Sequence, residues 1–144
     1  MKTFFYLLAA CIVLVCCNAT NTVSRPTAND QILGEQDTVR IANDDIGYEI
    51  TIIDPGFNSW LITNARPEGY YSQEYLENRN IQYVTEWNIR VLQPQRYNPN
   101  LYEMQINYEP GIDYGYEVNY KLYNYFIYFQ LTYNQRLGGN IPKF

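Results

Sequence analysis

All three cysteines of this 144-residue chain, Cys11, Cys16 and Cys17, lie near its N-terminus. The sequence after position 17 contains no thiol and therefore cannot form an internal disulfide. Such a sequence has to hold its fold by packing alone, which is feasible because domains of about 55 to 65 residues already fold without disulfides. The cysteine placement thus predicts one domain with a packed core, downstream of these residues.

The segment that carries the cysteines has the pattern of a lipoprotein signal peptide. Lys2 precedes an apolar run over residues 4–15, and the sequence becomes polar directly after Cys17. The run is shorter than the roughly 20 residues of a membrane-spanning helix, and it fits the h-region of about 7 to 15 residues in a cleaved signal. We expect a signal peptide over residues 1–16 and acylation of Cys17 with fatty acids such as palmitate. This predicts a lipid-anchored protein of the cell envelope, facing the periplasm.

Two alternatives to this interpretation stay open. Cys11 follows Leu-Ala-Ala, which resembles a lipobox more closely but leaves a shorter h-region. The other is a secreted protein without a lipid, either with an ordinary cleaved secretory signal or from a eukaryote, in which Asn18-Ala19-Thr20 would be a glycosylation sequon next to the cleavage point.

Residues 17–46 are polar, lack aromatic side chains and show little periodicity. We interpret them as a flexible, disordered tether, which for a chain of this length spans roughly 30 Å. The globular domain is then expected over residues 47–144.

Periodicity predicts the first elements of that domain. Residues 47–53 alternate apolar and polar side chains, which is typical of a strand, and a short helix is expected over residues 57–65. A longer amphipathic helix is predicted over residues 72–92, where Ser72 is a candidate N-cap and Pro94 a stop.

The C-terminal half is less uniform. Residues 102–108 alternate again and predict a second strand with one polar face. Residues 114–137 fit a helix or two strands, and we favour the helix because no turn signal interrupts them. The expected fold is a small α+β domain in the order β-α-α-β-α, with a two-stranded sheet packed on amphipathic helices.

Charge and composition exclude several kinds of function. The chain has 15 acidic and 10 basic residues, a formal net charge of −5, which argues against nucleic acid as a partner. It has no histidine, so a Ser-His-Asp triad, a Cys-His dyad and the usual zinc sites are absent. No Gly-rich phosphate loop occurs. We therefore expect no enzyme activity, no catalytic residues, no metal and no cofactor.

Carboxylates leave one catalytic alternative, because glycoside hydrolases need only a pair of acids at a defined separation. Glu86, Glu103 and Glu117 lie on three predicted elements and would be the candidates. The acids considered for calcium lack the regular spacing of a calcium loop; they are Asp44 with Asp45, Asp54, and Glu109 with Asp113.

Tyrosine is the most unusual part of the composition, with 16 residues in the chain. Trp60 and Trp87 are expected in the core, where aromatic rings bury a large area each. So many tyrosines cannot all be buried, and exposed ones would offer a binding surface. The candidates for that surface are Tyr114, Tyr116, Tyr120 and Tyr123.

Four segments carry a resemblance to a known family. They are IDPGF at 53–57, VTEWN at 84–88, NPNLYE at 98–103 and YGYEVNY at 114–120. Over about residues 47–137 the chain resembles a domain-of-unknown-function family of small lipoproteins from Bacteroidetes-type bacteria. The resemblance implies an envelope location and supplies no activity. The leading hypothesis is a non-enzymatic binding or assembly protein that acts on an envelope protein or polymer through a tyrosine-rich surface.

Overall fold

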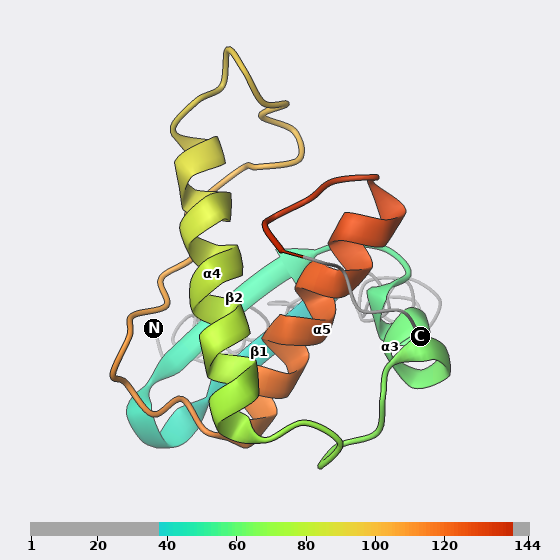
Figure 1. The fold of residues 1–144 in the computed structure, drawn as a ribbon, viewed down its shortest axis with the longest axis vertical. Helices are drawn as coiled ribbons and strands as arrows, with labels where there is room; N and C mark the ends of the chain where they lie inside the picture. The colour runs from blue at the N-terminus through green and yellow to red at the C-terminus, as the bar shows by residue number, and fades with distance from the viewer. Residues whose placement is uncertain (1–37, 140–144) are drawn as a thin grey trace, which may run out of the picture.

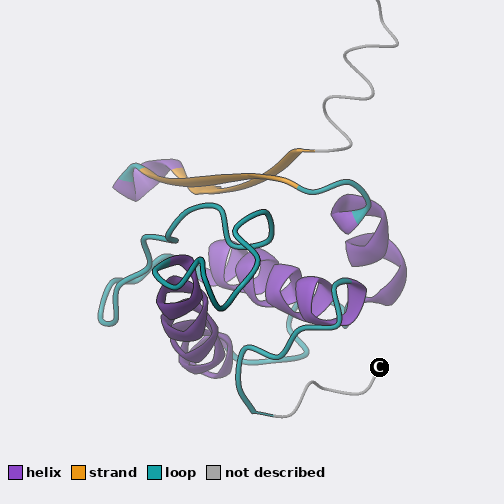
Figure 2. Cartoon of the chain, turned by 90° about the horizontal axis from the view of Figure 1, so that it is seen from above, coloured by secondary structure: helices purple, strands orange, loops and turns teal. Residues whose placement is uncertain are grey.

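The structure is a computed structural model that describes residues 38–139. Two antiparallel strands come first and three α-helices follow. The strands form one layer, and the two long helices lie on the same side of it (Figure 1, Figure 2). The predicted fold class is confirmed, because a two-stranded sheet packs on helices in an α+β arrangement. The position of one strand along the chain differs from the prediction.

The sheet is a hairpin of β1 (Thr38–Asn43) and β2 (Tyr48–Ile53), joined through the 3-10 helix η1 (Asp44–Ile46). Val39 and Ile41 of β1 are buried, and β1 packs against the last helix. The inward side chains of β2 are only half-buried, because β1 is the strand that packs closely against α5.

The hairpin corrects the predicted domain boundary. Residues 38–46, which were expected to belong to the tether, form β1 and η1. Their alternation of Val39 and Ile41 with polar neighbours is a strand signal of period two, and pairing with β2 stabilises it. The rest of the predicted tether and the whole predicted signal lie outside the described residues.

The two helices that follow agree with the sequence. α3 (Phe57–Asn64) and α4 (Gln73–Val91) match the predicted ranges within a residue or so at each end. Ser72 is the N-cap of α4, and its hydroxyl accepts a hydrogen bond from the Tyr75 amide. This contact satisfies one of the four free amides at the helix start.

α5 (Tyr116–Thr132) is one helix rather than two strands, as favoured from the sequence. It begins after Gly115, whose φ is 81°, and is shorter at its C-terminal end than predicted. The helix is buried around most of its circumference because β1, α3 and α4 all pack against it. α5 is therefore the central element of the domain.

α4 and α5 run in the same direction (Figure 1). Asn80 of α4 donates a hydrogen bond to the backbone carbonyl of Asn119, and further along Trp87 packs on Phe126 and Phe129. The chain between the helices has to return along the outside of α4 to reach the start of α5. That return is made by residues 92–115, which contain no helix or strand.

The predicted strand over residues 102–108 is wrong. The segment pairs with no strand, and it is fixed to α4 by side chains instead. Asn88 accepts a hydrogen bond from the Ile106 amide at 2.8 Å and donates one to the Ile106 carbonyl at 2.9 Å. Trp87 donates to the Met104 carbonyl at 3.0 Å. Of the alternating apolar residues, Tyr102, Ile106 and Tyr108 are buried and Met104 is 65% exposed. The pattern therefore reflects partial burial of one side, without a neighbouring strand.

Candidate functional site

The tyrosines that were predicted to form a binding surface are mostly buried. Tyr123 is fully enclosed, and its ring lies between those of Tyr71 and Tyr83. Tyr114 is also buried, with its ring 4.3 Å from that of Tyr48 and 4.5 Å from that of Tyr108. These rings are part of the core and cannot contact a partner.

Tyr116 and Tyr120 have a different structural role. The Tyr116 hydroxyl accepts a hydrogen bond from the Gly69 amide at 2.6 Å, and the Tyr120 hydroxyl donates one to the Arg66 carbonyl at 2.7 Å. Tyr120 is buried and Tyr116 is half-buried. Both therefore fasten the loop between α3 and α4 onto α5. The surface predicted from Tyr114, Tyr116, Tyr120 and Tyr123 is thus corrected, because burial removes three of its four rings.

The loop that they fasten carries an exposed aromatic surface of its own. Tyr70 is 58% exposed and Tyr75 is 37% exposed, and Tyr71 lies between them with its ring 4.7 Å from each. The Arg66 guanidinium lies 5.2 Å from the centre of the Tyr70 ring. We call Arg66, Tyr70, Tyr71 and Tyr75 the Tyr70–Tyr75 face. It lies at the N-terminal end of α4, at the bottom of Figure 1.

The sequence analysis missed the Tyr70–Tyr75 face although a signal was present. Tyr70 and Tyr71 directly follow the turn of Pro67, Glu68 and Gly69, and rings beside such a turn have few core elements to pack on. The predicted surface was placed on the segment with the most tyrosines instead, and that segment contains α5, which is largely buried.

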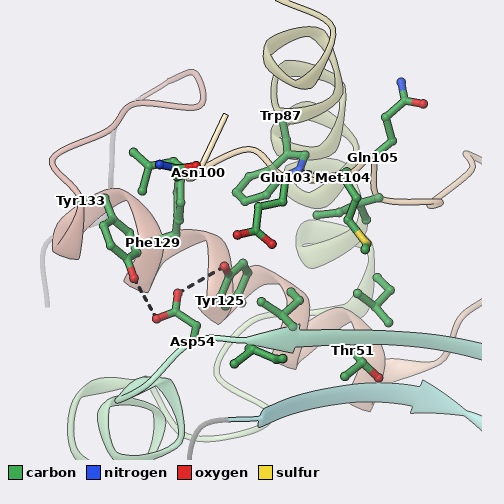
Figure 3. A pocket seen from close by; sticks show the side chains of 15 residues that line it. Thr51, Asp54, Trp87, Asn100, Glu103, Met104, Gln105, Tyr125, Phe129 and Tyr133 are labelled. Carbon is green, nitrogen blue, oxygen red and sulfur yellow. Dashed lines mark hydrogen bonds between the residues drawn. The ribbon is translucent and has the colours of Figure 1, made fainter. Parts of the chain in front are cut away.

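A cavity of about 220 Å³ lies on the helix-facing side of β2 (Figure 3). One wall is β2 with Asp54, and the opposite wall is the segment from Asn100 to Ile106. The floor is aromatic and consists of Trp87, Tyr125, Phe129 and Tyr133. β1 is the strand that packs closely on α5. Space is therefore left between β2 and the helices, and the cavity occupies it.

Among residues 38–139, Asp54 is the one buried carboxylate; it directly follows β2 and is 4% exposed. Its oxygens accept hydrogen bonds from Tyr133 at 3.0 Å, Tyr128 at 3.2 Å and Tyr125 at 3.3 Å. The Tyr128 hydroxyl also lies 2.8 Å from the Pro55 carbonyl, so its single proton is shared between two acceptors. Among the described residues, no basic group forms an ion pair with Asp54.

This environment raises the pKa values of Asp54 and of the tyrosines that contact it. Burial raises the pKa of the Asp54 carboxyl, although the three tyrosine hydrogen bonds oppose that change. Burial, together with the hydrogen bond to Asp54, raises the pKa of Tyr133 to about 12. The pKa of Tyr125 is raised for the same reasons. The tyrosines consequently stay protonated at neutral pH and act as donors to Asp54.

The acids proposed for glycan hydrolysis do not meet in one site. Glu117 pairs with Lys121 at the start of α5, and Glu86 pairs with Arg90. Trp87, next to Glu86, contacts Phe126. Phe126 is nine residues beyond Glu117, or roughly 14 Å along the helix axis, which exceeds the separation in either type of glycosidase. Glu103 lines the cavity, and neither of the other two does.

The remaining candidates give no further site in the described part of the chain. Asp44 and Asp45 are exposed in η1, and residues 38–139 contain no group of three or more potential ligands that could hold a metal ion. Cys17 and Cys11, the candidates for lipidation, lie outside the described residues. Over the same range no helix has the length and apolar character needed to cross a bilayer.

Comparison with known proteins identifies a family but no activity. Residues 4–141 match the family of unknown function DUF6146, and the chain belongs to that family. The match confirms the predicted resemblance to a family without an assigned function. No curated protein and no solved structure is detectably similar to the chain.

Proposed function

We propose that this member of the DUF6146 family is a lipid-anchored protein of the cell envelope that binds a partner protein or envelope polymer and has no enzymatic activity. The N-terminal pattern ending at Cys17 supports the anchor. The Tyr70–Tyr75 face supports the binding role, and its exposure is the observation on which the proposal rests. The hypothesis of a tyrosine-rich binding surface is thus kept, but the Tyr70–Tyr75 face replaces the tyrosines predicted from the sequence.

The chemistry of the Tyr70–Tyr75 face suits recognition. Tyrosine gives a large contact area at a small cost in side-chain entropy, and tyrosine and arginine are both enriched at the energetic centres of interfaces. Here Arg66 already lies over the Tyr70 ring, and the Tyr71 and Tyr75 rings stack with an interplanar angle of 14°. Rings held by one another lose little freedom on binding, which favours affinity.

The underlying loop also supports the proposal. Its backbone is tied to α5 through the Gly69 amide and the Arg66 carbonyl, as described above. The first turn of α4, which carries Tyr75, is fixed by the Ser72 cap. A surface mounted on these contacts has a defined shape before any partner arrives, and pre-organised surfaces bind with a smaller ordering cost.

A binding experiment with envelope extract tests this function. The wild type is compared with the double variant Tyr70→Ala/Tyr75→Ala, and with Leu92→Ala as a matched control at the other end of α4, where Leu92 is 69% exposed. We expect one retained component to be lost with the double variant and kept with the control, at a cost of about 2 kcal/mol, or roughly thirtyfold in affinity. Equal retention by all three proteins would contradict the role of the face.

A further inference from the structure

The cavity on the helix-facing side of β2 has an unusual set of charged residues in its lining. Two carboxylates line it, Asp54 and Glu103, and its lining residues include no lysine or arginine. Asp54 has only hydroxyl donors around it, from Tyr125, Tyr128 and Tyr133. A cavity with two negative charges and no positive one has its electrostatic complement in a cation.

Glu103 strengthens this argument because it forms no ion pair with any residue of the described range 38–139. The ion pairs of the described residues involve Arg40, Arg90 and Lys121, and none of them includes Glu103. In Figure 3 its carboxylate points into the cavity, between Trp87 and the group of Asp54 and Tyr125. The side chain is exposed, yet it is directed inward rather than away from the protein.

The remaining walls suit the same kind of ligand. Trp87, Tyr125 and Phe129 present aromatic rings to the cavity, and Ile50 and Ile52 line it from β2. Aromatic rings attract organic cations through their quadrupoles, and quaternary and substituted ammonium groups are bound in this way. The tryptophan ring is the strongest of the three in this respect.

The size of the cavity limits the ligand. Its volume is about 220 Å³. An apolar cavity of about 150 Å³ accommodates benzene, and sites for drug-sized molecules begin near 300 Å³. The ligand is consequently somewhat larger than a single ring and smaller than a typical drug.

We propose that this cavity binds a small organic cation, an ammonium group on a compact apolar body. The ammonium lies between Asp54 and Glu103, and the apolar part packs on Trp87 and Phe129. The inference goes beyond the function proposed above and does not depend on it. Tyr75 and Trp87 are twelve positions apart on α4, roughly 18 Å, so the two sites can be tested separately.

Titration of the protein with phenethylammonium tests the proposal, with 2-phenylethanol as the uncharged probe of similar shape. Calorimetry measures affinity, and the indole N–H resonance of Trp87, assigned with Trp87→Phe, reports the location. We expect saturable binding of phenethylammonium at least about fivefold tighter than of the alcohol. The Trp87 resonance should shift and that of Trp60 should not.

Two variants of equal net charge complete the test. Glu103→Gln should weaken phenethylammonium binding by about three- to fivefold and leave the alcohol unaffected. Glu74→Gln, in the first turn of α4 and outside the cavity lining, should bind like the wild type. The proposal is overturned if phenethylammonium does not bind, if both probes bind equally, or if the two variants lose the same affinity. Because Glu103 is exposed, its substitution is expected to leave the fold intact.

Discussion

At the residue scale, Asp54 shows how the fold tolerates a charge in its core. An isolated buried carboxylate is costly, and here tyrosine hydroxyl groups rather than a basic side chain offset that cost. Tyr125 lies on α5 and Tyr133 directly follows it, while Asp54 directly follows β2. The carboxylate therefore also connects the sheet to the central helix.

The raised pKa of Asp54 predicts a particular dependence of stability on pH. A carboxyl whose pKa is higher in the folded state contributes stability at low pH that is lost as the pH rises through the folded pKa. The free energy of unfolding of the wild type, minus that of Asp54→Asn, should therefore fall from about pH 4 toward pH 7. Urea unfolding at several pH values measures it.

The exposed Asp45→Asn is the control for the loss of one carboxylate. If the difference in free energy of unfolding between the wild type and Asp54→Asn stays constant or rises with pH, the pKa of Asp54 is not raised in the folded state.

At the element scale, α4 and the segment 102–108 beside it show what the sequence could and could not predict. α4 was predictable because its cap, its periodicity and its stop are all local. The segment 102–108 has an equally clear local pattern, but a strand needs a neighbouring strand, and the cavity separates this segment from β2. Asn88 provides the hydrogen bonds that a neighbouring strand would have provided.

The same reasoning explains the errors in the candidate site. Whether Tyr123 is buried depends on α4 and on the loop before it, which no local pattern of α5 reports. Asp54 was considered only as a calcium ligand because its tyrosine partners lie more than 70 positions away in the sequence. Long-range contacts of this kind decide exposure, and periodicity alone does not contain them.

Asn88→Ala tests the attachment of the segment to α4. The substitution removes both hydrogen bonds to the Ile106 backbone. The Ile106 side chain is buried. We expect the free energy of unfolding to fall by about 1 to 3 kcal/mol, measured by urea titration. Asn107→Ala, which changes an exposed neighbour, should stay within about 0.5 kcal/mol. Equal effects of the two changes would contradict the attachment.

At the scale of the whole molecule, the Tyr70–Tyr75 face and the cavity lie near opposite ends of α4, and the helical core separates them. The described domain starts at Thr38, and Cys17 precedes it by 21 positions. If flexible, a chain of that length has a root-mean-square span of roughly 25 Å. The proposed acylation of Cys17 would thus keep both sites close to a membrane surface, where the proposed envelope partner would be found.

The proposed lipid anchor at Cys17 is central to this function, and metabolic labelling with a fatty acid tests it directly. The wild type, Cys17→Ala and Cys11→Ala are expressed with a labelled fatty acid, and membranes are separated from the soluble fraction. We expect label and membrane association in the wild type and in Cys11→Ala, and the loss of both in Cys17→Ala. An unlabelled wild type in the soluble fraction would contradict the anchor.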